Sequence, residues 1–466
     1  MSKKPVSIFN EVLGPVMRGP SSSHTAGAYR IGMVARELFG RKISRILVSF
    51  SSKGSLPTTY VSQGSEIGLM AGLLNVPIED EKVPHIMDYV RSLGIAVETV
   101  VHDKDCQHPN IYEVTLEAED GYSMDCVGVS VGGGMSKVVE VNGLSVDIDG
   151  DEDIEIPGIG RLSRVLPVGY DRNAVLPFRD AESFALMDPD REMWEYALDY
   201  ESARTGMDRD YLFSLAGYIY DVMRTSVNTG LNGTVWADRI LGQQSHLVDA
   251  ASRKGANVPS PLLHTLEKYA MAVMECKSSY GLIVAVPTAG SCAVVPSVIL
   301  SLCDLYGYSK DMAVKALLAV GLIGVFIAER STFSAEVAGC QAECGAASGM
   351  AAAGVVQLRG GSSGKAAAAA SFALQNILGM VCDPIAKRVE APCLGKNVMC
   401  ALNAVSAADM VLAGADALLP LHEVIAAMDE VGRAIPREYR CTGLGGLSMC
   451  PTSLKIEETL SGKQNG

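Results

Sequence analysis

The sequence predicts a two-domain protein, with a small α/β or α+β domain at the N-terminus and a larger, mostly α-helical domain after it. Its 466 residues exceed what one compact core usually holds, since cores rarely grow past about 250 to 300 residues. Strand and helix patterns mix in residues 1–150, whereas the patterns after residue 200 are helical. With 48% hydrophobic and 20% charged residues, the chain has enough apolar material for both cores.

In the N-terminal domain, strands are expected where β-branched residues concentrate and partly alternate with polar ones. These segments are 43–50, 110–117 and 137–141. Helices are expected over 26–39, 56–74 and 81–93. This mixture predicts a sheet with one face covered by helices.

The acidic segment 147–155, DIDGDEDIE, precedes a Gly- and Pro-containing stretch and favours an exposed connector. We therefore expect a small domain over 1–150, a connector over 151–190, a helical domain over 191–455 and a polar tail over 456–466. Helical patterns begin with 193–205, 208–228, 237–253 and 261–276, and continue through Ala-rich runs.

The formal charge of −14, with no basic cluster, argues against nucleic acid or an anionic membrane as a partner. No apolar run follows the two N-terminal lysines, so export is not expected and a cytoplasmic location is. Two uncharged runs, 278–303 and 316–328, are long enough to raise a membrane protein as an alternative. Pro287 and Pro296 interrupt the first run, and charges crowd the second, which favours buried core helices.

Residues 19–25, GPSSSHT, come directly before the helix expected from Ala26. One hydroxyl would suffice to cap that helix. Three serines, a histidine and a threonine exceed what a cap needs, and helix-terminal amides with hydroxyls suit an anion such as a carboxylate. His24 could move a proton near neutral pH.

Ten of the twelve cysteines lie from Cys276 onward. In a reducing compartment they are free thiols or metal ligands rather than disulfides. A candidate metal site is formed by the segment 339–344 (GCQAEC), with Cys340 and Cys344, together with Cys382 and Cys393. Nearby prolines place the last two at expected helix ends, where exposed amides favour a thiolate. Buried core thiols are the alternative. If three thiolates held a four-iron cluster, one iron would stay open as a Lewis acid.

Other features of the sequence are weaker indications of function. The glycine run 132–134 lacks the spacing of a nucleotide loop and is expected to form a turn. The remaining cysteines and histidines are expected to be structural. Lys277 beside two serines has no phosphate-binding glycine loop with it, so pyridoxal phosphate is not expected.

Five segments together resemble the iron–sulfur-dependent L-serine dehydratase (L-serine ammonia-lyase) family in its single-chain form. They are 19–25 (GPSSSHT), 286–291 (VPTAGS), 339–341 (GCQ), 382–384 (CDP) and 389–393 (VEAPC). The resemblance runs through nearly the whole chain. It implies dehydration and deamination of L-serine to pyruvate and ammonia, on a [4Fe-4S] cluster held by Cys340, Cys382 and Cys393.

The resemblance also implies that the small domain corresponds to the family's β or allosteric substrate-binding region. Serine would place its hydroxyl at the open iron and its carboxylate near the two hydroxyl-rich segments, with His24 as the proton carrier. The implied substrate-binding residues are Ser21, Ser22, Ser23, Thr25, Thr288, Ala289, Gly290, Ser291 and Asn397. A homodimer or other homo-oligomer is expected.

The sequence departs from the family at two places. Where members carry G-H-G-T-D, with a histidine that is a candidate base, this chain has Ser62-Gln-Gly-Ser-Glu66. Glutamine cannot act as a base, so His24 alone, another group such as Lys53 or Tyr60, or a different substrate is implied. Some single-chain members end in a cysteine that reaches the cluster, but this chain ends Lys-Gln-Asn-Gly. A related eliminase for cysteine, threonine or another hydroxy-amino acid, and a silent amino-acid sensor, stay open as alternatives.

Overall fold

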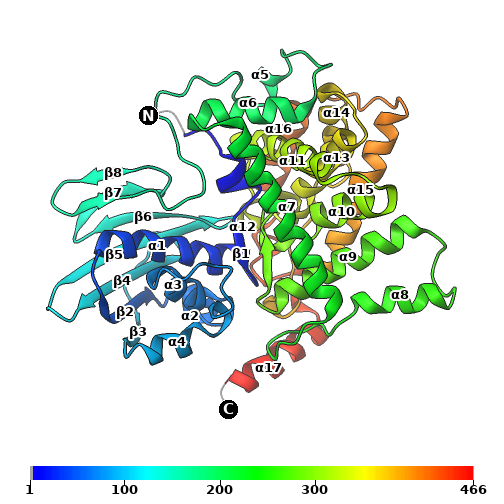
Figure 1. Ribbon diagram of the computed structural model, residues 1–466. Coiled ribbons are helices and arrows are strands. Elements are labelled where there is room, and N and C mark those ends of the chain that lie inside the picture. The colour runs from blue at the N-terminus through cyan, green and yellow to red at the C-terminus, as the bar shows by residue number, and fades with distance from the viewer. Residues whose placement is uncertain (1–3, 465–466) are drawn as a thin grey trace. The chain divides into compact units, whose positions relative to one another are not determined.

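The computed structural model describes residues 4–464, with side chains described up to residue 460 (Figure 1). The chain divides into two compact units, of which the smaller comprises Met17–Tyr170. The larger comprises the residues up to Val16 together with those from Asp171 onward. The predicted fold class is confirmed, because the smaller unit contains a sheet with helices and the larger unit is mostly helical.

The N-terminal residues belong to the larger unit, although their position in the sequence suggested the small domain. Glu201, which is fully buried, accepts hydrogen bonds from the Ser7 hydroxyl (2.6 Å) and the Ile8 amide (2.8 Å). The Arg204 guanidinium donates to the Pro5 carbonyl at 2.9 Å. Buried charged groups need such partners, which ties this segment to a helix almost 200 residues away in sequence.

The smaller unit extends to Tyr170 rather than ending near residue 150, because the acidic segment is folded rather than exposed. Its strand β8 (Ile154–Ile156) pairs with β9 (Gly160–Leu162). The Gly150 carbonyl accepts from the amides of Val165 (2.9 Å) and Leu166 (3.0 Å). Asp151 is 5% exposed. The acidic and Gly-rich composition of this stretch predicted an exposed connector. Its backbone is instead paired with other parts of the smaller unit.

The sheet of the smaller unit has six strands in the order β3-β2-β4-β5-β6-β7. Strand β3 runs parallel to β2, and the other neighbouring pairs are antiparallel. The strands are β2 (Ile43–Ser51), β3 (Ala96–His102), β4 (Ile111–Ala118), β5 (Ser123–Gly132), β6 (Met135–Val141) and β7 (Leu144–Ile148). Burial alternates along β4, as expected for a sheet with one covered face.

Helix α1 (Gly27–Phe39) packs on β5 and β6 and against α3 (Ser65–Leu73). A β-carbon at Gly128 would lie 2.5 Å from the Ile31 side chain, so the sheet and α1 meet closely there. The single helix expected over 56–74 is interrupted, leaving α2 (Leu56–Thr59) and α3. Gly64, the N-cap residue directly before α3, has a φ of +82°, which lies in the left-handed region that favours glycine. Helix α4 (Ile86–Ser92) completes the unit.

The larger unit is built around two buried helices, α11 (Lys310–Arg330) and α13 (Cys344–Leu358), which pack on each other. The surrounding helices are α6 (Met193–Thr205), α7 (Arg209–Asn232), α8 (Ser245–Arg253), α9 (Pro261–Ser278), α10 (Val294–Tyr306), α14 (Ser363–Gln375), α15 (Cys393–Leu412) and α16 (Leu421–Ala434). The shorter elements are β1 (Val16–Arg18), which starts at the unit boundary, α5 (Ala181–Phe184), β10 (Leu282–Val284) and α12 (Ala335–Ala338). Helix α17 (Pro451–Gln464) occupies the expected polar tail, whose last two residues lie outside the described part.

Two segments are apolar and long enough to cross a membrane, 289–306 and 310–330, with mean hydropathy 1.5 and 2.0. Of these windows, 83% and 78% respectively is buried inside the protein. Their burial in the helical core accounts for their hydropathy, as the sequence predicted.

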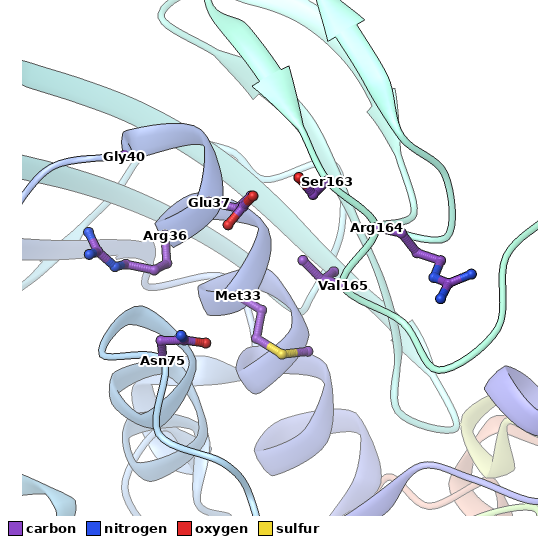
Figure 2. A pocket seen from close by; sticks show the side chains of 8 residues that line it. All are labelled: Met33, Arg36, Glu37, Gly40, Asn75, Ser163, Arg164 and Val165. Atoms are coloured by element: carbon purple, nitrogen blue, oxygen red, sulfur yellow. The ribbon is translucent and has the colours of Figure 1, made fainter. Parts of the chain in front are cut away.

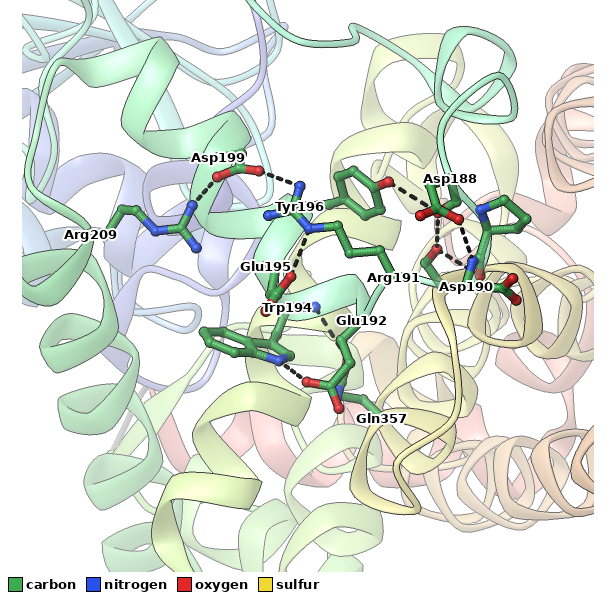
Figure 3. Close-up of polar contacts among 12 residues, drawn as sticks. Asp188, Asp190, Arg191, Glu192, Trp194, Glu195, Tyr196, Asp199, Arg209 and Gln357 are labelled. Atoms are coloured by element: carbon green, nitrogen blue, oxygen red, sulfur yellow. Dashed lines mark hydrogen bonds and ion pairs between the residues drawn. The ribbon is translucent and has the colours of Figure 1, made fainter.

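A polar network fixes the start of α6 (Figure 3). Arg191 pairs with Glu195 (2.7 Å) and Asp199 (2.7 Å), and Asp199 also pairs with Arg209 at the start of α7. The Trp194 amide donates to the Gln357 side chain of α13 at 3.2 Å. These contacts join α6, α7 and α13 at one end of the larger unit.

Candidate functional site

The serine-rich segment of the smaller unit forms a helical turn of its own. Residues Ser22–Ala26 are π-helical and run directly into α1, so the helix begins four residues earlier than the sequence suggested. The Thr25 amide donates to the Ser21 carbonyl at 2.8 Å, and the Ser23 carbonyl accepts from the Ser130 hydroxyl at 2.6 Å. The structure thus brings Ser21, Ser22, Ser23, His24 and Thr25 together in one turn.

The imidazole of His24 is held on one side and unpartnered on the other. Its Nδ1 shares a hydrogen bond with the Ser21 hydroxyl at 3.0 Å. Its Nε2 is shielded from solvent and has no hydrogen-bond partner among residues 4–464. Burial lowers the pKa of His24 to about 4, so the ring is neutral at pH 7. With the hydrogen on Nδ1, the Nε2 lone pair is an available proton acceptor.

Gln63 lies beside this turn. Its carbonyl accepts from the Thr25 hydroxyl at 3.1 Å. Helix α3 approaches the same residue, since a β-carbon on Gly68 would lie 2.0 Å from the Thr25 carbonyl oxygen. Position 63, where the family pattern has a histidine, therefore neighbours the serine-rich turn, but its amide side chain offers no base.

A pocket of about 470 Å³ also lies in the smaller unit (Figure 2). Met33, Glu37, Asn75 and Ser163 are among the residues that line it, and none of the predicted site residues does. In Figure 2 the guanidinium groups of its two arginines point away from one another. The pocket is distinct from the serine-rich turn.

The second hydroxyl-rich segment, 288–291, is a buried turn of the larger unit. The Thr288 hydroxyl donates to the Glu343 carboxylate at 2.7 Å, and the Ser291 hydroxyl donates to the Val286 carbonyl at 3.0 Å. The turn backbone comes close to the same carboxylate, because a β-carbon on Gly290 would lie 2.9 Å from a Glu343 oxygen. Ala289 completes this turn and is also buried.

Asn397 of α15 joins this turn to the expected ligand Cys393. Its Nδ2 donates to the Gly290 carbonyl (2.8 Å) and the Cys393 carbonyl (2.8 Å), and its Oδ1 accepts from the Ala293 amide (3.1 Å). The side chain is fully buried. These contacts make Asn397 a positioning residue for both segments.

The three expected metal ligands are buried in the larger unit, with Cys340, Cys382 and Cys393 exposed by 2%, 4% and 6%. The Cys340 thiol makes side-chain hydrogen bonds with Cys344 and Cys382, and these lower its pKa well below the ordinary value. Cys393 interacts electrostatically with Cys340, while burial raises its own pKa. The structure therefore places thiols from three separate segments close enough to influence one another electrostatically.

The local structure around these thiols differs in part from expectation. Cys393 is the first residue of α15, which agrees with the expected helix end. Cys382 does not lie at a helix end. It forms an isolated parallel bridge with Arg440, in which the Cys382 amide donates to the Tyr439 carbonyl at 2.8 Å. The bridge to Arg440 has no local signal in the sequence. Pro384, on which the expected helix end was based, follows the bridge.

Two lysines, Lys277, which is buried, and Lys396, which is half-buried, lie beside the thiols. Lys396 donates to the Val381 carbonyl (2.8 Å) and the Asp383 carboxylate (2.9 Å). Burial lowers the pKa of Lys396, but Cys340 and Asp383 outweigh this and raise it above its ordinary value. Lys277 is fully buried, donates to the Val389 carbonyl and interacts with Cys393. Cations withdrawn from water require anionic neighbours, and for Lys396 these are the Asp383 carboxylate and Cys340, the thiol whose pKa is lowered.

Within residues 4–464, no three His, Cys, Asp or Glu side chains converge closely enough to hold a single metal ion. An iron–sulfur cluster is larger than one ion and binds thiolates set farther apart. Buried thiols with cations beside them are the donor chemistry that such a cluster requires. The residues present therefore fit an iron–sulfur cluster better than a mononuclear site.

Two residues of this site escaped the sequence analysis. Glu343 is half-buried, and desolvation followed by the charge of Cys340 raises its pKa to about 8. Its place between Cys340 and Cys344 in the sequence was the available signal. Cys441, expected to be a core thiol, makes a side-chain hydrogen bond with Cys382. These two cysteines lie 59 positions apart in the sequence, so no spacing rule could pair them.

Comparison with known proteins places these features in a family context. Residues 189–448 match the family model described as serine dehydratase alpha chain. The chain is 36% identical over 258 residues to a probable L-serine dehydratase alpha chain of Bacillus subtilis, covering 55% of this chain and 86% of the relative. Over 145 residues it is 42% identical to the corresponding beta chain, covering 31% and 64% respectively. A single-chain L-serine dehydratase of Streptomyces coelicolor is 28% identical over 470 residues, covering 95% and 98%.

Proposed function

Because this chain belongs to the serine dehydratase alpha chain family, we propose that it is a carbon–oxygen lyase that converts L-serine to pyruvate and ammonia. The relatives named L-serine dehydratase support the substrate, and the near full-length likeness to the Streptomyces protein supports a single chain that contains both parts. The observation that carries the proposal is the proximity of Cys340, Cys382 and Cys393 to one another and to Lys277 and Lys396 in the matched region.

The proposed cofactor is a [4Fe-4S] cluster on Cys340, Cys382 and Cys393. When bound, such a cluster with three thiolate ligands supplies a Lewis-acidic iron that helps a hydroxyl group to leave. Lys277 and Lys396 offset the negative charge of the thiolates in this buried setting. Their two contacts with backbone carbonyls fix the position of each ammonium group.

The residues around the turn 288–291 are proposed to bind the amino acid. Glu343 is half-buried and presents its carboxyl group against Gly290, and we assign it to the substrate ammonium group. Thr288 orients that carboxylate through its 2.7 Å hydrogen bond. Asn397 fixes the position of the turn relative to Cys393 by donating to the Gly290 and Cys393 carbonyls. The site would thereby select an α-amino acid whose side chain carries a leaving group.

His24 is the proposed proton carrier, with Ser21 orienting its ring. In the reaction the Cα–H proton is removed, the Cβ–O bond breaks, and the departing hydroxide takes up a proton to become water. The resulting aminoacrylate tautomerises to an imine, and water hydrolyses this to pyruvate and ammonia. A neutral, desolvated imidazole suits the first of these steps, because burial keeps its acceptor nitrogen unprotonated at pH 7.

Gln63 favours a second candidate function, elimination from a related amino acid or amino-acid sensing without catalysis. The residue lies beside the serine-rich turn and lacks the base of the family pattern. Anaerobically reconstituted protein should be assayed with L-serine, L-threonine and L-cysteine, measuring the 2-oxo acid, ammonia and sulfide released. Faster turnover of L-serine supports the proposal. Faster turnover of another amino acid, or none with any, supports the second candidate.

A second comparison tests the assignment of the proton carrier. His24→Ala should abolish turnover while leaving the iron content unchanged. Turnover equal to that of the wild type would exclude His24. Gln63→His should increase the turnover of L-serine if the missing base limits the rate.

A further inference from the structure

Cys441 lies in the segment between α16 and α17, outside the three expected ligands. Its thiol lies close enough to the Cys382 thiol for each to shift the pKa of the other. The Cys382 thiol makes the same kind of contact with Cys340, which is an expected ligand. Cys441 therefore stands in the same relation to Cys382 as one cluster ligand does to another.

The backbone fixes this relation. The Cys441 amide donates to the Cys382 carbonyl at 2.8 Å, and the Cys382 amide donates to the Tyr439 carbonyl at 2.8 Å. These two bonds flank the bridge between Cys382 and Arg440. The contact between the two thiols thus follows from paired backbones and not from one flexible side chain.

The conformation of Cys441 is unusual for its residue type. Its φ is +60°, in the left-handed region that glycine and asparagine favour. The segment continues with Gly443, at φ +68°, and Gly446, at φ +59°. In this segment Gly443 and Gly446 take the other left-handed positions, whereas Cys441 takes one with a side chain. That side chain places a thiol beside the site.

Cys441 also interacts electrostatically with the other two expected ligands, Cys340 and Cys393. The four thiols consequently share one neighbourhood. Cys441 is only partly buried, whereas the three expected ligands are buried.

Cys344 is the competing thiol, because it contacts Cys340. Its sulfur, however, already contacts two other polar groups, the Gly290 carbonyl at 3.6 Å and the Asn397 Nδ2 at 3.5 Å. It is fully buried at the start of α13. These contacts hold Cys344 toward the turn 288–291, while Cys441 is held toward Cys382.

We propose that Cys441 is a fourth thiolate ligand of the cluster and binds the iron that Cys340, Cys382 and Cys393 leave open when no substrate is present. Clusters of this type take four thiolates where the chain provides them. The inference rests on the proposed function, since it presumes the cluster. It adds a ligand from outside the three cysteines of the family pattern, and it gives the resting site protection against loss of iron.

The test compares full-length wild type with Cys441→Ser, reconstituted anaerobically with iron and sulfide. A cluster with an unprotected iron loses that iron on mild oxidation and becomes a three-iron cluster. We expect Cys441→Ser to lose one iron per chain at least tenfold faster than the wild type under ferricyanide. Electron paramagnetic resonance should show the three-iron signal in proportion, independently of turnover.

Three further variants make the result decisive. Cys441→Gly, which accepts the left-handed conformation without strain, should behave like Cys441→Ser and guards against misfolding. Cys450→Ala, at an exposed cysteine nine residues on, should lose iron at the wild-type rate. Equal rates for Cys441→Ser, Cys441→Gly and wild type, or fast loss confined to Cys344→Ala, would overturn the inference while leaving the proposed function intact. A wild-type chain that binds no iron would overturn the proposed function, and this inference with it.

Discussion

Replacing Asn397 with alanine should loosen the turn 288–291 and Cys393 together. The truncation removes three hydrogen bonds, to the Gly290 carbonyl, the Cys393 carbonyl and the Ala293 amide, and a longer contact of 3.5 Å with the Cys344 sulfur. The side chain is fully buried, so water cannot replace them. At about 1 kcal/mol for each lost bond, the free energy of unfolding should fall by about 3 kcal/mol.

Asn403 provides a matched control six residues along the same helix. Its Nδ2 donates to the Ser348 hydroxyl (2.9 Å) and the Ala373 carbonyl (2.9 Å), and its Oδ1 accepts from Asn376 (2.7 Å). Asn403→Ala loses the same number of bonds away from the cysteines and the turn. It should also destabilise the chain, by less because the site is only half-buried, but it should keep the full iron content.

The assay is urea unfolding together with iron analysis after anaerobic reconstitution. Asn397→Ala should lose both stability and iron, and Asn397→Asp should be at least as damaging, because an oxygen would face two carbonyl oxygens. Stability within about 0.5 kcal/mol of the wild type, with complete iron, would refute the role given to Asn397.

Three other outcomes follow from the structure. Burial lowers the pKa of His24 from 6.5 to about 4, so above pH 6.5 the histidine is neutral in both the folded and the unfolded chain. As the pH falls from 6.5 through 4, the unfolded chain is protonated first, and the free energy of unfolding should decrease by about 3 kcal/mol. His24→Gln should lack this loss in urea unfolding at pH 4 to 7, and identical pH profiles would contradict the burial. Gly230→Ala would place a β-carbon 2.0 Å from the Ala272 carbonyl oxygen, and should destabilise the protein by roughly 3 kcal/mol or more, whereas Gly217→Ala in the same helix has room and should not. Above pH 8, where Glu343 is ionised, Glu343→Gln should raise the KM for L-serine at least tenfold by removing the charge that meets the ammonium group; an unchanged KM at that pH would reject the assignment.

The fold was predictable where helical periodicity persists. Helix α6 coincides with the expected 193–205, and α9 ends two residues beyond its expected end. Segment 237–253 is helical only over α8, because the chain before Ser245 is held by contacts at long range, such as the Glu275 carboxylate accepting from the Gln244 amide at 2.6 Å. Edge strand β3 escaped prediction because most of its residues are exposed and its pattern does not alternate.

The site was predictable where the residues that matter stand in recognisable segments. The serine-rich turn and the three expected cysteine ligands were named from such segments and from their resemblance to the family pattern. Glu343 and Cys441 were not, because their roles come from contacts with segments distant in the sequence. The β-bridge that brings Cys441 to Cys382 has no local signature.

The central claim, a cluster on Cys340, Cys382 and Cys393, is tested most directly by iron content. Anaerobically reconstituted wild type and Cys106→Ser, a control at a cysteine of the smaller unit, should each bind about four irons per chain. Cys382→Ser and Cys393→Ser should lose most of that iron. Retention of about four irons per chain by both variants would contradict the account.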